Sequence, residues 1–194
     1  MTEIKFYFFT NILDEIIVKN IIKFKNICII YRPEKDGSKN FIQITKIKNF
    51  CNKNKILLYI ADSYKLANKH NADGIFLSNS NKSFLKPLFI KSKFNIIGSA
   101  HNFGDYYLKK RQGCKTIMLS PIFFNNKYSD NKILGINKFN LISNFWNTKL
   151  CALSGINLNN LKKLRMCKIK SIGFISLMKD LKIKKPIYFF SRWA

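Results

Sequence analysis

Seven short apolar segments in this chain each end in a polar loop at the same point of a repeating cycle, and an eighth segment precedes them. Stretches with helical spacing follow most of the loops. The segments are Lys5–Phe9, Ile27–Tyr31, Ile56–Ala61, Gly74–Ser78, Asn95–Ser99, Thr116–Ser120, Leu150–Ser154 and Ser171–Ser176. Short apolar runs of this kind are typical of strands buried on both faces. Eight such strands alternating with helices predict a closed parallel (β/α)8 barrel, whose chemistry lies on the loops that follow the strands.

The length of the chain sets the size of this barrel. The sequence has 194 residues, whereas a (β/α)8 barrel typically has about 250. No linker or low-complexity block divides it, so we expect one trimmed domain over residues 1–194. The expected helices are Ser63–His70, Lys82–Lys91, Phe103–Arg111, Asn137–Trp146 and Asn157–Met166. The longest loop, Pro121–Leu134, is of a length that is usually functional or disordered. The basic, aromatic end of the chain should pack against the barrel.

Cysteine usage and hydropathy indicate a reduced, cytoplasmic protein. The five cysteines show no paired spacing, which argues against a disulfide framework or a zinc site. Cys28 and Cys151 lie in apolar strands, so we expect buried thiols there. No apolar run approaches the roughly 20 residues of a membrane helix, and the start of the chain does not resemble a signal peptide.

The formal net charge of +25 raises the question of nucleic-acid binding. The lysines are spread along the whole chain, and Arg32, Arg111, Arg165 and Arg192 are the only arginines. A protein that reads nucleic acid is expected to use arginine for base edges and phosphates. We therefore expect no nucleic-acid partner, but the charge should attract small anionic ligands.

Small residues mark the ends of the last two predicted strands, at Gly155 and Ser176. They let main-chain N–H groups approach a ligand closely, and a helix that starts just afterwards favours an anion. Barrels commonly bind phosphate at the loops after strands seven and eight. An equally good interpretation from spacing alone is that Gly155 only permits a tight turn.

Two polar residues mark the end of the fifth strand, Ser99 and His101. A histidine at a strand end can move protons near neutral pH. The alternative is a helix-capping segment with a solvated imidazole ring, which the residues alone favour slightly. His70, the other histidine, falls late in a predicted helix and is interpreted as a solvated surface residue.

Four fragments occur in an order and spacing that resemble one known family. They are Ala72–Leu77, Gly98–His101, Leu119–Phe123 and Ala152–Asn157. Together they resemble the thiamine phosphate synthase/TenI family, over about residues 28–178. The family fold is a (β/α)8 barrel, in agreement with the strand count.

The resemblance implies two related activities. The synthases join an aminopyrimidine methyl diphosphate to a thiazole phosphate and release pyrophosphate, with Mg²⁺. The TenI branch tautomerises a thiazole phosphate carboxylate with a histidine after strand five. By position, Gly155, Ile175 and Ser176 would bind the thiazole phosphate through the main chain. Ser99 and His101 match the family's Ser-x-His, and Asn125 and Lys127 fall near its substrate-binding loop residues.

The chain departs from the family pattern mainly in the diphosphate half. Arg32 can be matched and Lys35 is displaced by one position, while a glutamine is lost. Asp62 is the only carboxylate left at the implied metal positions, because Asn81 stands where the second is expected. The resemblance therefore implies a weakened Mg²⁺ site.

Three hypotheses follow from the resemblance. The first is a thiamine phosphate synthase in which Arg32, Lys35 and Asp62 manage the diphosphate. The second is a TenI-like tautomerase with His101 as acid and base. The third is a barrel that binds thiazole phosphate without catalysis. Loss of the carboxylate at Asn81 favours the second and third, and retention of Arg32 and Asp62 favours the first.

Overall fold

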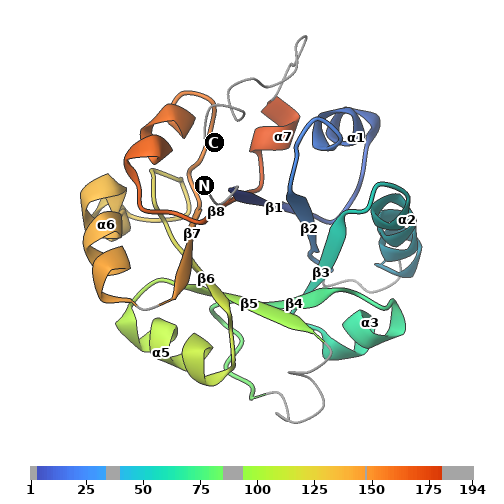
Figure 1. Ribbon diagram of the computed structural model, residues 1–194, viewed down its shortest axis with the longest axis horizontal. Helices are drawn as coiled ribbons and strands as arrows, with labels where there is room; N and C mark the ends of the chain where they lie inside the picture. Colours follow the sequence, from blue (N-terminus) through green and yellow to red (C-terminus); the bar gives the residue numbers. More distant parts are fainter. Residues whose placement is uncertain (1–3, 34–39, 85–93, 147, 181–194) are drawn as a thin grey trace.

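The computed structural model describes residues 4–33, 40–84, 94–146 and 148–180. These residues form a closed barrel of eight parallel strands in chain order, which confirms the predicted (β/α)8 fold (Figure 1). Strand β1 pairs with β2 on one side and with β8 on the other, which closes the barrel. The strands are β1 (Lys5–Thr10), β2 (Ile27–Tyr31), β3 (Leu57–Ala61), β4 (Gly74–Leu77), β5 (Asn95–Ala100), β6 (Thr116–Leu119), β7 (Lys149–Leu153) and β8 (Ser171–Phe174).

Helices surround the barrel as an outer ring in Figure 1. The α-helices are α1 (Glu15–Ile21), α2 (Asn40–Lys53), α3 (Tyr64–Lys69), α5 (Phe103–Arg111), α6 (Gly135–Phe145) and α7 (Leu177–Asp180). Two short 3₁₀ helices, η2 (Asp130–Lys132) and η3 (Leu161–Met166), complete the described elements. The expected helix Lys82–Lys91 is irregular over 82–84 and then passes out of the described residues, as does the end of the chain.

Side-chain caps explain where three of the helices begin. Asp14, Ser63 and Asn102 precede α1, α3 and α5, and each accepts a hydrogen bond from an N–H group in the first turn of its helix. Such a cap satisfies one of the main-chain donors that a helix start leaves unpaired and contributes about 1 kcal/mol.

The segment after β7 differs from the prediction. Residues 157–166 were expected to form a helix, but the chain turns at 158–160 and then forms the 3₁₀ helix η3. The side-chain oxygen of Asn157 accepts from the N–H groups of Asn159 and Asn160, and Asn160 Nδ2 donates to Gly155 O at 2.7 Å. Asn157 thus caps first-turn N–H groups as at a helix start, and the bond from Asn160 holds the turn beside β7, but residues 161–166 wind as a 3₁₀ helix and not as an α-helix.

The core has an inner and an outer layer. The outer layer packs helices against the barrel, and the inner layer fills the barrel with side chains from alternate strand positions. Inside, the ring of Tyr59 occupies the space beside Gly74, where an added Cβ would lie 2.3 Å from Tyr59 Cε1. The inner layer also holds Cys28 and Cys151, as expected, and burial raises the pKa of their thiols to about 11 and about 12. The packed interior leaves chemistry to the ends of the barrel.

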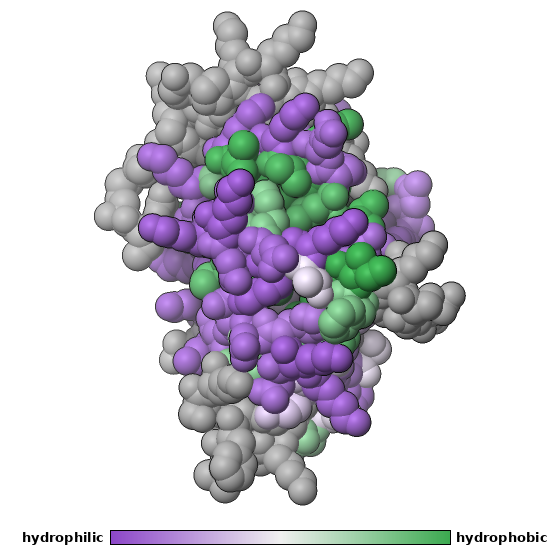
Figure 2. All heavy atoms as spheres, turned by 90° about the vertical axis from the view of Figure 1, so that its right-hand side faces the viewer, coloured by the Kyte–Doolittle hydropathy of each residue, from purple (hydrophilic) through white to green (hydrophobic). Residues whose placement is uncertain are grey.

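The surface is dominated by hydrophilic side chains with apolar residues among them, as Figure 2 shows for the face on the right of Figure 1. Among the described residues, exposed Ile16, Ile22, Phe41 and Ile42 lie in or just after α1 and α2, which that face presents. No helix in the described part of the chain is long and apolar enough to cross a membrane.

Candidate active site

The predicted site residues that the structure describes lie at or just beyond the carboxyl ends of the strands. Ser99 is in β5, and Arg32, Asp62 and His101 directly follow β2, β3 and β5. The remaining ones follow β6, β7 and β8; they are Asn125, Lys127, Gly155, Ile175 and Ser176. Lys35 lies outside the described residues. Parallel strands bring all these loops to one end of the barrel, as expected for this fold.

A cavity of about 480 Å³ at this end is lined by five of the residues expected to bind substrate. Asn125 and Lys127 contribute from the loop after β6, Gly155 from the loop after β7, and Ile175 and Ser176 from the loop after β8. Gly155, Ile175 and Ser176 were expected to bind the thiazole phosphate, and the structure places all five residues around one cavity.

Three of the residues that line this cavity have main-chain N–H groups with no hydrogen-bond partner among the described residues. None of the hydrogen bonds within the described residues uses the N–H of Gly155, Ile175 or Ser176. Ser154 and Gly155 both have left-handed backbone, with φ of 76° and 74°. Unpaired N–H groups and the Lys127 ammonium form a site suited to an anion.

Both the close packing around position 155 and its left-handed backbone favour glycine there. A Cβ at this position would lie 2.3 Å from Phe123 O and 2.6 Å from Phe124 O. The glycine therefore lets the loop after β6 cross directly over the loop after β7. Asn125 Nδ2 then donates to Ser154 Oγ at 3.1 Å, which ties the two loops at the cavity rim.

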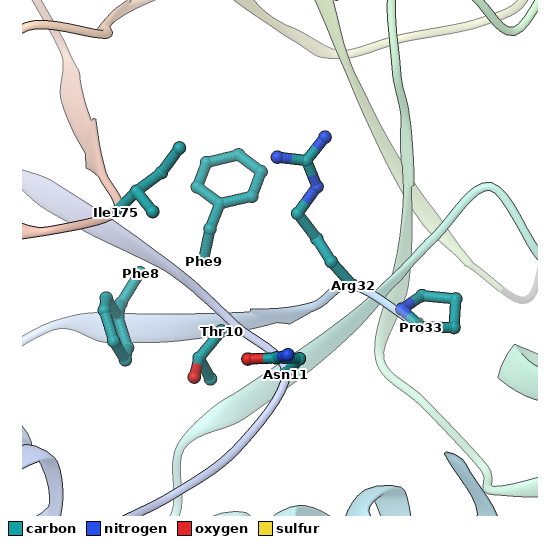
Figure 3. Close-up of a pocket in the computed structure, with 7 residues that line it drawn as sticks. All are labelled: Phe8, Phe9, Thr10, Asn11, Arg32, Pro33 and Ile175. Carbon is teal, nitrogen blue, oxygen red and sulfur yellow. The ribbon is translucent and has the colours of Figure 1, made fainter. Parts of the chain in front are cut away.

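A second cavity, of about 300 Å³, lies beside the first and shares Ile175 with it (Figure 3). Phe9, Thr10 and Asn11 line it from the end of β1, and Arg32 and Pro33 line it from the end of β2. Figure 3 shows the Phe9 ring between Ile175 and the Arg32 guanidinium. Arg32 Cζ lies 5.8 Å from the centre of that ring, a cation–π arrangement that orients the charge at the cavity.

The sequence reasoning missed Phe9, Thr10 and Asn11. Phe9 ends an apolar strand and was counted as core, and the polar pair directly after it was the available signal. Thr10 Oγ1 hydrogen-bonds both main-chain groups of Ile12, which shapes the chain where it leaves β1.

His101 is oriented by the residue that follows β6. Its Nδ1 lies 2.8 Å from the carbonyl oxygen of Ser120 and 3.1 Å from Ser120 Oγ. Because a carbonyl oxygen only accepts, Nδ1 donates in that bond, and in the neutral tautomer with this proton the lone pair is on Nε2. The Tyr128 ring packs 5.5 Å from the His101 ring. Ser99 is buried on the same side of β5 as Ile97, which faces the barrel interior.

His70 is less solvated than predicted. It ends α3, and its ring lies 5.5 Å from the ring of Phe41. Its Nε2 is buried without a hydrogen-bond partner in the described structure, and burial lowers the pKa of the imidazole.

The Asp62 carboxylate is held through hydrogen bonds to its Oδ1 atom. Its Oδ1 accepts hydrogen bonds from the N–H of Ser78 at 2.8 Å and from Nδ2 of Asn81 at 3.0 Å. Its second oxygen makes no hydrogen bond with the described residues, and no group of three metal-binding side chains occurs among them. This donor set fits a Mg²⁺ ion that takes its other ligands from water and substrate phosphates.

A cavity at the ends of the last two strands, with polar residues at the ends of other strands, is the arrangement typical of phosphate-binding (β/α)8 barrels. Comparison with known proteins makes this class specific. The family model described as thiamine monophosphate synthase matches residues 8–178. The chain therefore belongs to the thiamine monophosphate synthase family, which confirms the resemblance found in its motifs.

Individual relatives agree with this assignment. The thiamine-phosphate synthase of Methanococcus maripaludis is 25% identical over 178 residues, which cover 90% of this chain and 86% of the relative. That of Clostridium tetani is 31% identical over 147 residues, 75% of this chain and 70% of the relative. Among solved structures, a thiamine phosphate pyrophosphorylase from Pyrococcus furiosus superimposes with a TM-score of 0.78 at 17% identity, covering 98% of this chain and 95% of that one.

Proposed function

We propose that this protein is a thiamine-phosphate synthase, which joins an aminopyrimidine methyl diphosphate to a thiazole phosphate. The observation that carries the proposal is the cavity that Asn125 and Lys127 line together with Gly155, Ile175 and Ser176, whose N–H groups make no hydrogen bond with the described residues. A phosphate monoester needs several donors and a cation in such a place. The adjoining cavity with Arg32 then supplies a neighbouring position for the diphosphate partner.

In this reaction the thiazole nitrogen attacks the methylene carbon of the aminopyrimidine. A C–N bond forms, the C–O bond to the diphosphate breaks, and pyrophosphate leaves with the bonding electrons. Arg32 would bind the diphosphate, and Asp62 would use its second oxygen toward a Mg²⁺ ion that accompanies it. Such an ion, when bound, neutralises charge on the leaving group. Holding the two substrates in adjoining cavities supplies the proximity that the displacement needs.

A TenI-like tautomerase is the second candidate, and one observation favours it. The bond between His101 Nδ1 and Ser120 leaves Nε2 free to accept and return a proton. A synthase does not require that chemistry, since its leaving group carries the difficult charge. We also propose that the protein works in the cytoplasm, where its free thiols would stay reduced.

Calorimetric titration tests the proposal directly. We expect binding of thiazole phosphate alone and of the aminopyrimidine diphosphate with Mg²⁺, followed by formation of thiamine phosphate when both are present. Binding of thiazole phosphate without the diphosphate would instead support the tautomerase or a non-catalytic binder. Conversion of a thiazole phosphate carboxylate would distinguish these two.

The variant Gly155→Ala tests the phosphate cavity. Its Cβ must displace the main chain at Phe123 and Phe124, so we expect thiazole phosphate affinity to fall by at least about tenfold, roughly 1.4 kcal/mol. Gly104→Ala, in helix α5, is the matched control, because the nearest atom to its added Cβ is Asn102 Oδ1 at 3.4 Å. Equal affinity in the two variants would contradict the assignment of the cavity.

Magnesium titration of the free protein tests the metal site. Asp62 offers one carboxylate oxygen, and Asn81 directs an amide N–H toward the same residue. We expect no detectable Mg²⁺ binding in the absence of diphosphate, and measurable binding of Mg²⁺ together with pyrophosphate. Tight binding of Mg²⁺ to the free protein would show that further ligands exist.

A further inference from the structure

Helix α5 carries three buried polar side chains on the face that it turns toward the barrel. Asp105 and Lys109 lie one turn apart within the helix, and Gln112 is the residue that caps its end. Their spacing of four and then three residues places them on one side of the helix. Polar groups are costly to bury unless they are paired, so this arrangement needs partners. The partners come mainly from the segment Ser78–Ser83, here called the β4 loop, which directly follows β4.

Lys109 is the central contact. Its side chain is 0% exposed, and its Nζ donates to the carbonyl oxygens of Ser78 at 2.6 Å and Asn81 at 2.8 Å. Burial lowers the pKa of Lys109, and the nearby Cys114, Asp62 and Asp105 oppose that shift. The two carbonyl oxygens therefore take the place of the water molecules that would bind an exposed Lys109 ammonium group.

The barrel is shaped to admit this lysine. A Cβ at Gly98 in β5 would lie 2.9 Å from Lys109 Cδ. The absence of a side chain at Gly98 thus makes room for the alkyl stem of Lys109 between α5 and the strand. The alkyl stem of Lys109 is therefore buried against β5, and its ammonium group is buried against the β4 loop.

Two further side chains fasten the β4 loop to α5. Gln112 Nε2 donates to the carbonyl oxygens of Asn81 at 3.1 Å and Ser83 at 2.8 Å. Asp105 accepts a hydrogen bond from Lys82 Nζ at 3.3 Å. It also accepts one from the side-chain amide nitrogen of Asn79 at 2.7 Å, in the amide orientation that satisfies both the oxygen and the nitrogen of Asn79.

The fastened loop reaches the candidate active site at Asp62. The same loop supplies the two donors that bind Asp62 Oδ1, the N–H of Ser78 and the amide of Asn81. Each of these residues also gives its carbonyl oxygen to Lys109. A continuous set of hydrogen bonds therefore runs from Lys109 through the β4 loop to the one carboxylate at the implied metal position.

We propose that Lys109 is a positioning residue for the diphosphate half of the site. It holds the β4 loop in the shape that keeps Asp62 fixed through Oδ1, with the second oxygen available to a cation and diphosphate. This role rests on the proposed synthase function. The thiazole phosphate cavity is built from the loops after β6, β7 and β8, so it does not depend on Lys109.

The test compares two ligands in one variant. In Lys109→Met, which keeps the volume and removes the donors, we expect the affinity for pyrophosphate with Mg²⁺ to fall at least tenfold and that for thiazole phosphate to stay within twofold. Amide hydrogen exchange over Ser78–Ser83 should accelerate, and exchange after β7 and β8 should not. Lys110→Met is the matched control, since Lys110 is exposed on the same helix and its Nζ reaches Thr148 instead.

Each outcome has a definite meaning. Unchanged pyrophosphate affinity in Lys109→Met, or equal loss of both ligands, overturns the role of Lys109. If that variant does not fold, Gln112→Leu removes two other bonds to the β4 loop, and unchanged pyrophosphate affinity there overturns the proposal equally. Wild-type protein that binds neither ligand contradicts the proposed function itself, and the role of Lys109 falls with it. Wild-type protein that binds thiazole phosphate and not pyrophosphate with Mg²⁺ also contradicts the synthase function, whereas wild-type protein that binds both ligands while Lys109→Met keeps its pyrophosphate affinity contradicts the positioning role alone.

Discussion

The two histidines of the chain occupy different environments, and their substitution distinguishes the candidate activities. His101 is anchored at Nδ1 by Ser120 at the end of the barrel that carries the site, whereas His70 packs on Phe41 at the end of α3. In a tautomerase, His101→Asn should lower the rate by about 10²–10⁴, because it removes the acid and base. In a synthase the loss should be smaller, since His101 would only orient groups.

His70→Asn is the control for this experiment and should leave the rate of either reaction nearly unchanged. Rates of both reactions with thiazole-phosphate substrates provide the measurement. A larger loss at His70 than at His101 would contradict the placement of the site.

Single residues also show where prediction from sequence succeeds and where it fails. Gly155 was recognisable because the family resemblance places it at the phosphate site, although spacing alone left a tight turn equally open, and the structure gives it both a positive φ and a close approach to Phe123. Lys109 was not recognisable, because a lysine in a helix is usually solvated. Its burial depends on the course of the β4 loop, which follows a different strand.

At the scale of elements, the strands were predictable because most of their residues are buried and apolar. Their ends were less so. The predicted segments included Ser78 and Ser120, but in the structure β4 and β6 each end one residue earlier. A small residue directly after a strand does not interrupt the sequence pattern, so the pattern does not mark the last paired residue. For residues 157–166 the prediction was wrong in the type of helix: Asn157 caps the segment as it would at an α-helix start, but residues 161–166 form a 3₁₀ helix.

Helix α5 yields a prediction at the same scale, because it supports both the fold and the β4 loop. Asn102 Oδ1 accepts from the N–H of Asp105 at 2.9 Å and caps the helix. We expect Asn102→Ala to destabilise the protein by about 0.5–2 kcal/mol, and Asn102→Ser to restore most of that stability. Equilibrium unfolding in urea measures both variants. Equal stability of the alanine and serine variants would show that the cap contributes nothing.

The whole molecule combines a predictable framework with a site that only folding assembles. Strand count and loop position could be read from the sequence, and so could the phosphate half, because barrels of this class place it after the last two strands. The cavity lined by Phe9, Thr10 and Arg32 could not, because it forms where β1 and β2 end side by side. Of the residues that line this cavity, only Arg32 could be matched to the family pattern.

The excess of positive charge is a property of the whole molecule, and it should act on substrate capture and on stability in opposite directions. With a formal net charge of +25, the folded chain repels itself and attracts anions over distances comparable to the Debye length, about 10 Å at 0.1 M salt and about 3 Å at 1 M. Raising KCl from 20 mM to 500 mM at constant Mg²⁺ should therefore lower kcat/KM for the phosphorylated substrates several-fold, mainly through KM. The same change should raise the melting temperature, because self-repulsion is screened. Sucrose at matched osmolality is the control. Because sucrose is uncharged and does not screen charges, it should not reproduce the fall in kcat/KM. If kcat/KM does not respond to KCl, the field of the lysine-rich surface has no part in bringing substrate to the barrel, and the local donors around Gly155 and Arg32 account for binding alone.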